Sequence, residues 1–174
     1  MNRGTYRKNG YDMENGIADV DWGIVARIVH MLAVVVWIGG VWFVTLVVLP
    51  TMRKKPSEQW LAEFNAVERR FAPQARTAVL LVLLSGLYML YRYDLWDRFA
   101  DPRYWWMHLM VAVWLLFAVL LFVLEPLVGH HVIDRRAGDA PRATLKLMLR
   151  FHRLMLALAL LAIFAAIGGA HGLF

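Results

Sequence analysis

The chain has 174 residues, 60% of which are hydrophobic, and its formal net charge is +6. This apolar fraction is too high for an ordinary soluble domain and predicts an integral membrane protein. The basic residues lie in short clusters between apolar runs and form no recognisable nucleic-acid-binding module, so nucleic acid is not an expected partner. The absence of cysteine excludes disulfides, thiolate metal sites, iron–sulfur clusters and covalent c-type haem.

Four apolar segments follow a polar N-terminal segment, residues 1–23, which is expected to lie outside the membrane. Each segment is close to the ~20 residues that cross ~30 Å of hydrocarbon as a helix. A lone strand would leave its backbone groups unpaired in lipid. The predicted fold is therefore all-α, an up-down four-helix bundle that spans the bilayer within residues 24–174. Its helices are expected at about 24–49, 72–91, 104–125 and 152–170.

The start of the first helix and the connection to the second carry local signals. Asp21 is expected to cap the first helix. Within 57–71, large apolar residues recur at helical spacing with polar residues between them, which predicts an amphipathic helix on the membrane surface. Packing of this segment onto the helix ends as a lid is an equal alternative. The second transmembrane helix is expected to begin at Pro73.

The distribution of Lys and Arg predicts the orientation of the bundle. With four crossings, both termini and the 92–103 connection lie on one side of the membrane. That side carries seven of the 19 Lys and Arg residues, and the other side carries twelve. The positive-inside rule then places both termini outside, in the periplasm, in a multi-pass protein of the plasma (inner) membrane.

Three histidines are predicted to converge at the outer end of this bundle. His30 lies about two turns into the first apolar segment, where an ionisable side chain is costly and needs a partner. The first and third helices run in the same direction, so His108 reaches the same level. His171 ends the antiparallel fourth helix on that side. His152 is instead expected as a cation at the level of the cytoplasmic headgroups.

The pattern fits one b-type haem with His30 and His108 as axial ligands and His171 in reserve. The first and third helices of such a bundle are diagonal, so histidines on them can grip a flat cofactor from both faces. A second haem would need histidines 13 or 14 residues further along, and those positions hold other residues.

Residues around this site have expected supporting roles. Arg27, together with Arg92 or Arg103, could pair with haem propionates at the outer surface. Trp37 lies on the same helical face as His30 and continues an apolar wall. A polar stripe that includes Tyr88 at the end of the second helix could contact a quinol.

The expected role is electron transfer or another membrane redox reaction, with a quinol or a redox protein as partner. A bis-histidine iron favours electron transfer, whereas a five-coordinate haem, formed if His108 is not a ligand, could act on small molecules. The chain could therefore be a haem-dependent oxidoreductase, and it could form an oligomer.

Three other interpretations remain open. His30 could simply hydrogen-bond a neighbouring helix. Nine methionines and six histidines without cysteine could serve a copper-binding or copper-uptake protein. Met110, however, lies about 200° around the helix from His108, and methionine is a common filler of apolar helices. The chain could also be a cofactor-free assembly subunit of a larger membrane complex.

Four short motifs resemble those of a known membrane family. They are the His30-Met-Leu-Ala-Val-Val-Val-Trp-Ile-Gly-Gly run, Arg69-Arg-Phe with the later Ser85-Gly-Leu-Tyr, Trp105-Trp-Met-His108, and Gly169-Ala-His-Gly. Together they resemble the copper-resistance D (CopD)-like family and the related membrane protoporphyrinogen oxidases (HemJ), over most of residues 24–172.

The resemblance implies an all-helical bundle, with b-type haem in the oxidase branch and copper handling in the copper-resistance branch. His30 matches the first-helix histidine of the family, and His108 matches the histidine of a Trp-x-His-x-Lys pattern. Met110 occupies the position of the lysine in that pattern. This departure puts protoporphyrinogen oxidation in doubt and leaves haem binding open.

Overall fold

The protein is an all-α membrane bundle, as the sequence predicts. A computed structural model describes residues 20–129, 135–136 and 139–174, and these residues form helices, turns and no strand. Four helical stretches are long and apolar enough to span a bilayer: Trp22–Met52, Gln59–Arg92, Pro102–Leu127 and Pro141–Ala170. The chain is therefore a multi-pass membrane protein whose surface is suited to lipid.

Several of these spans combine more than one helix type. The first contains α1 (Trp22–Phe43), the π-helical η2 (Val44–Val48) and α2 (Leu49–Met52). The second is α3 (Ser57–Arg92), followed by the short 3₁₀ helices η3 (Trp96–Phe99) and η4 (Pro102–Tyr104). The third contains α4 (Trp105–Val119) and the π-helical η5 (Leu120–Gly129), and the fourth is α6 (Pro141–Ala170).

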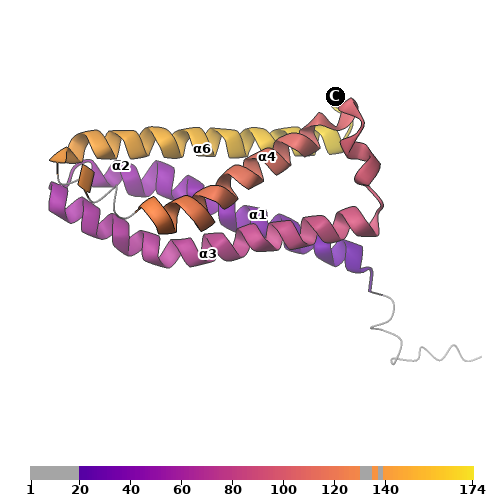
Figure 1. Cartoon of the computed structure of the whole chain (residues 1–174), viewed down its shortest axis with the longest axis horizontal. Coiled ribbons are helices and arrows are strands. Elements are labelled where there is room, and N and C mark those ends of the chain that lie inside the picture. Colours follow the sequence, from indigo (N-terminus) through magenta and orange to yellow (C-terminus); the bar gives the residue numbers. More distant parts are fainter. Residues whose placement is uncertain (1–19, 130–134, 137–138) are drawn as a thin grey trace, which may run out of the picture.

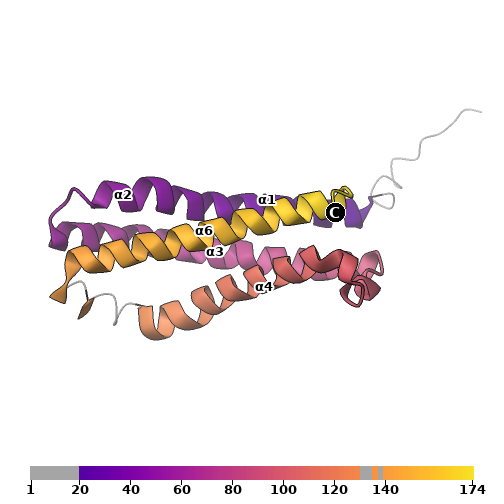
Figure 2. The ribbon, with the colours of Figure 1, turned by 90° about the horizontal axis from the view of Figure 1, so that it is seen from above.

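The spans pack as two pairs, α1 with α3 and α4 with α6, so that α1 and α4 are diagonal (Figures 1 and 2). This is the diagonal relation predicted for the first and third helices. The start of α1 and the end of α6 lie together, at what we call the Asp21 end. The connection between α2 and α3 lies at the other, Lys54, end. Trp37 and Phe117 meet across the diagonal, with ring centroids 4.9 Å apart.

Local signals fix the first helix as expected. The Asp21 side chain accepts a hydrogen bond from the Gly23 N–H at 2.8 Å and caps α1. Gly40 then lets α3 approach, because a Cβ at this position would overlap the Phe71 ring. The neighbouring Gly39 faces open space. Of the two glycines, Gly40 alone is needed for close packing.

The predicted break at Pro73 is wrong, because α3 continues through it. Pro73 removes one backbone hydrogen bond, and a proline inside a helix costs about 3 kcal/mol. Trp60 and Phe64 are only 2% and 6% exposed, packed with residues of α2 and α6. Burial of each such side chain contributes about 1.5–3 kcal/mol, which offsets the proline. The segment 57–71 is thus the first part of α3, and it packs against α2 and α6.

The last span begins 11 residues earlier than the predicted start at 152. Along its first turns, Thr144, Leu145 and Met148 are buried, whereas Arg142 and Lys146 are exposed. This is the stripe of an amphipathic helix, and burial of its apolar face extends α6 before residue 152.

Candidate functional site

His30 is half-buried on α1 and faces α3. Its Nδ1 lies 3.0 Å from the Ser85 hydroxyl oxygen, and that oxygen lies 2.5 Å from the Leu81 carbonyl oxygen. The shorter contact needs the single Ser85 proton, so Ser85 donates to Leu81. His30 Nδ1–H therefore donates to Ser85, and the neutral ring keeps its lone pair on Nε2. A histidine that ligates a metal is oriented in this way by its second nitrogen.

Two arginines gather around Tyr93 at the Asp21 end of the same helix pair. The guanidinium carbons of Arg27 and Arg92 lie 5.8 Å and 5.9 Å from the Tyr93 ring centroid. Both distances suit cation–π contact. Arg27 is three residues before His30 and so lies about one turn nearer the surface on the same face. Arg27 and Arg92 thus lie around one ring at the Asp21 end; their pairing with haem propionates stays a prediction.

Arg103, the other arginine predicted for the rim, is held by Asp101. Its side chain donates to both Asp101 carboxylate oxygens, and the closest of these contacts is 2.6 Å. These hydrogen bonds, with a further one from the Arg103 backbone N–H, lower the pKa of Asp101 below its ordinary value. Asp101 thus caps the start of η4, and Arg103 pairs with it and does not join Arg27.

His108 and His171 share the Asp21 end with His30, as predicted, but their side chains are exposed. The His108 ring stands edge-on to Phe99 with centroids 5.3 Å apart, and His171 Nδ1 lies 2.8 Å from the Ile167 carbonyl oxygen. The part of the chain that the structure describes contains no group of three His, Asp or Glu side chains placed to hold a metal ion. The bis-histidine pairing remains a prediction.

The remaining residues singled out from the sequence have other surroundings. Tyr88 and Tyr91 are 40% and 79% exposed at the end of α3. Trp37 is buried against Phe117, about two turns deeper than His30, and lines a different cavity. Of the methionines next to the predicted histidine ligands in sequence, Met31 is 51% exposed and Met107 lies in the core beside Trp106.

An apolar groove of about 610 Å³ lies along the seam between α1 and α3, and neither His30 nor Ser85 is among its lining residues. Val29, which precedes His30, and Leu81, which accepts the Ser85 proton, both line it. The volume lies within the range of small-molecule and cofactor sites. One oriented histidine, two arginines at the surface and an apolar groove thus lie along one helix pair.

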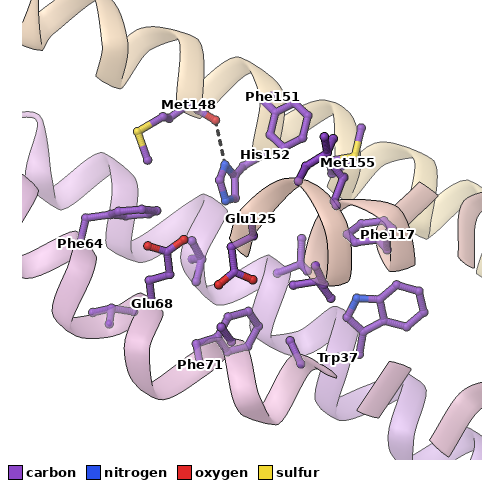
Figure 3. Close-up of a pocket in the computed structure, with 18 of the residues that line it drawn as sticks. Trp37, Phe64, Glu68, Phe71, Phe117, Glu125, Met148, Phe151, His152 and Met155 are labelled. Atoms are coloured by element: carbon purple, nitrogen blue, oxygen red, sulfur yellow. Dashed lines mark hydrogen bonds between the residues drawn. The ribbon is translucent and has the colours of Figure 1, made fainter. Parts of the chain in front are cut away.

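A second cavity, of about 510 Å³, lies nearer the Lys54 end and is lined by all four spans. Figure 3 shows Glu68, Glu125 and His152 pointing into it. Arg76 donates to Glu125 Oε2 at 2.8 Å and to the Leu121 carbonyl at 3.1 Å. The expectation of His152 as a headgroup-level cation is wrong, because its ring lines this cavity with Nδ1 2.9 Å from the Met148 carbonyl oxygen.

Sequence reasoning missed this cavity, although a signal was present. Arg76 and Glu125 are ionisable residues inside apolar spans, where such residues mark functional sites. The sequence places them 49 positions apart, so only the packing of α3 against η5 reveals the pair. The signal at His152 was weaker, because Arg150 and Arg153 beside it suggest a basic headgroup region.

Comparison with known protein families finds a match. A model with the description "Domain of unknown function (DUF4149)" matches residues 32–136, which is more than half of the chain. The match runs from α1 through η5 and includes Glu68, Arg76 and Glu125. No curated protein and no solved structure matches the chain. The chain belongs to the DUF4149 family.

Proposed function

We propose that the protein is a b-type haem protein of the plasma membrane that acts in electron transfer or a related redox reaction. The observation that carries this proposal is the orientation of His30, whose Nδ1–H is bound by Ser85. A ring held in this way presents Nε2 as a ligand, and a proximal histidine of this kind holds haem iron in many proteins. The Lys and Arg distribution supports a location of the Asp21 end in the periplasm.

The residues around His30 fit the other parts of a haem. Arg27 and Arg92 supply two positive charges near the surface for the propionates. When bound, the haem supplies one-electron chemistry, while the protein orients the axial ligand and excludes water. The likeness to the CopD-like and HemJ families is a further support.

The exposed position of His108 favours a haem with His30 as its one histidine ligand over the bis-histidine form. Ligation by His108 would need its side chain to leave Phe99 and turn toward a diagonal helix. A quinol or a soluble redox protein is the proposed electron donor. The methionine at the position of the family's lysine argues against protoporphyrinogen oxidation as the reaction.

The test is an absorption spectrum of the purified protein in detergent, with haem quantified after extraction. Wild-type protein is expected to show a Soret band and about one haem per chain, and His30→Ala is expected to lose both. His108→Ala is the matched control, since it removes an exposed histidine at the same end, and it is expected to keep the band. Circular dichroism of each variant checks that the helices remain.

Two results would contradict the proposal in different ways. A colourless wild-type protein, with or without bound copper, would remove haem as the cofactor. Loss of the Soret band in His108→Ala with retained helicity would restore the bis-histidine form and overturn the single-histidine site.

A further inference from the structure

The cavity near the Lys54 end is open toward lipid on one side. Figures 1 and 2 show that α4 and α6 converge at the Asp21 end and diverge toward the other end, where α4 continues as η5. Leu124 of η5 and Leu147 and Phe151 of α6 line the cavity and are 44%, 51% and 41% exposed. A molecule dissolved in the bilayer can therefore enter between these helices with an apolar chain left in the lipid.

The π-helical form of η5 places a carboxylate at this opening. Pro126 within η5 has no N–H to donate, and a π-helical turn changes the direction of side chains relative to an α-helix. Glu125 is held inward by Arg76, which also binds the Leu121 carbonyl on the same segment. Short π-helical segments are frequent at functional sites.

The polar side of the cavity is rich in hydrogen-bond acceptors. Glu68 and Glu125 contribute carboxylates, and Arg76 compensates the charge of Glu125 through their ion pair. His152 donates from Nδ1 to the Met148 carbonyl, so its neutral ring offers Nε2 as an acceptor (Figure 3). Two carboxylates disfavour an anionic ligand such as a fatty acid. They favour a ligand group that donates hydrogen bonds.

The opposite side of the cavity offers one donor on an aromatic wall. Trp37 is 4% exposed, and its Nε1–H has no hydrogen-bond partner in the described part of the chain. Figure 3 shows it across the cavity from Glu68, next to Phe117. A buried donor without a partner requires an explanation, and a ligand oxygen would supply one. Aromatic rings favour a flat ring between them.

We propose that this cavity binds an isoprenoid quinol, with one ring hydroxyl donating to His152 Nε2 on the polar side of the cavity. The second ring oxygen, on the far side of the ring, accepts from Trp37 Nε1–H. The isoprenoid chain leaves between η5 and α6. This site shares no residue with the His30–Ser85 pair or with the groove between α1 and α3. Quinol binding therefore does not depend on haem binding.

The experiment measures equilibrium binding of decylubiquinol to the full-length protein in phosphatidylcholine nanodiscs under reducing conditions. Saturable binding is expected for the wild type. His152→Phe keeps a ring of similar size and removes the Nε2 acceptor, so the dissociation constant is expected to rise about tenfold. His108→Phe, the same exchange at an exposed position, is the matched control and is expected to bind as the wild type does.

A second variant and two competing ligands distinguish a specific loss of binding from a general packing defect. Trp37→Phe keeps the aromatic wall and removes the donor, and it is expected to weaken binding severalfold. Decanol tests recognition of the aromatic ring, and decanoate tests the exclusion of anions. Both are expected to compete poorly with the quinol.

The proposal is overturned if binding is not saturable, or if His152→Phe and Trp37→Phe both bind as tightly as His108→Phe. If decanol or decanoate displaces decylubiquinol at an equal concentration, the proposed class of ligand is wrong. The result is separable from the haem proposal, because His30→Ala is expected to lose the Soret band and keep quinol binding.

Discussion

The Ser85 hydroxyl orients the His30 ring. It donates its proton to the Leu81 carbonyl and therefore accepts from His30. A serine without the Leu81 contact could donate to His30 and leave the proton on the other ring nitrogen. The 2.5 Å contact between Ser85 and Leu81 excludes that arrangement and selects the Nδ1–H tautomer. Gly86 packs against the same ring, since a Cβ there would be in van der Waals contact with His30 Cε1, at 3.4 Å.

This arrangement predicts the effect of removing one hydroxyl. In Ser85→Ala, His30 Nδ1–H loses its acceptor, and the ring becomes a less basic ligand. The Soret band is expected to remain, and the reduction potential of the haem is expected to rise, because a less basic ligand stabilises ferric iron less. Potentiometric titration of the purified protein measures this.

Ser85→Thr is the control for this change, because it keeps the hydroxyl and adds one methyl group. Its potential is expected to lie near that of the wild type. A potential unaltered in Ser85→Ala would show that Ser85 does not act on a ligand of the iron.

At the scale of elements, one ion pair ties α3 to η5. Arg76 and Glu125 are 34% and 17% exposed at their side chains, so the pair is partly withdrawn from solvent. Loss of one partner from a buried pair costs about 3–5 kcal/mol, whereas replacement of both can be nearly neutral. Exposure of Arg76 to the surroundings lowers the expected cost below that range.

Arg76→Met is therefore expected to destabilise the protein by about 2 kcal/mol, since Glu125 keeps its charge without a cation. The double variant Arg76→Met/Glu125→Gln is expected to recover most of that loss. Thermal unfolding in detergent across this double-mutant cycle measures the coupling. If the double variant is no more stable than the sum of the single effects predicts, the pair is not coupled.

The features predicted correctly are those that local sequence fixes. Asp21 caps α1 because its own side chain reaches the next turn, and the spans follow from runs of apolar residues. The break at Pro73 was wrong because the burial of Trp60 depends on α6, which is remote in sequence. The cavity could not be predicted for the same reason, since it combines Glu68, Glu125 and His152 from three separate spans.

The same contrast holds for the histidines. The three histidines can be placed at one end of the bundle from the sequence, because this needs only the direction and length of each helix. The direction in which each histidine side chain points depends on the rotation of its helix about the helix axis. Packing against the other helices sets that rotation. His108 is exposed because the neighbouring Trp106 and Met107 take the buried face of α4.

At the scale of the whole molecule, the four spans among the described residues place the start of α1 and the end of α6 on one side of the membrane. The absence of cysteine allows a direct test. Ala100→Cys lies at the Asp21 end and Lys54→Cys at the other, and both positions are exposed. A membrane-impermeant maleimide added to intact spheroplasts is expected to label Ala100→Cys and to leave Lys54→Cys unlabelled until the cells are lysed.

If Lys54→Cys alone is labelled in intact cells, the orientation is the reverse of the predicted one, and His30 lies near the cytoplasmic side. Labelling of both positions in intact cells would contradict the arrangement of the spans itself. Either result would change which soluble redox partners could reach the Asp21 end.

The contribution of all four spans to one cavity has a consequence for biosynthesis. The fourth span, with His152, enters the membrane after the other three, so a three-span intermediate holds Glu68, Glu125 and Arg76 before the last wall arrives. A charged side chain in a transmembrane helix costs about 2.5–3.5 kcal/mol on insertion. The Arg76–Glu125 pair joins the second and third spans and cancels two of these charges without the fourth. Insertion of α6 is then the step that completes the site.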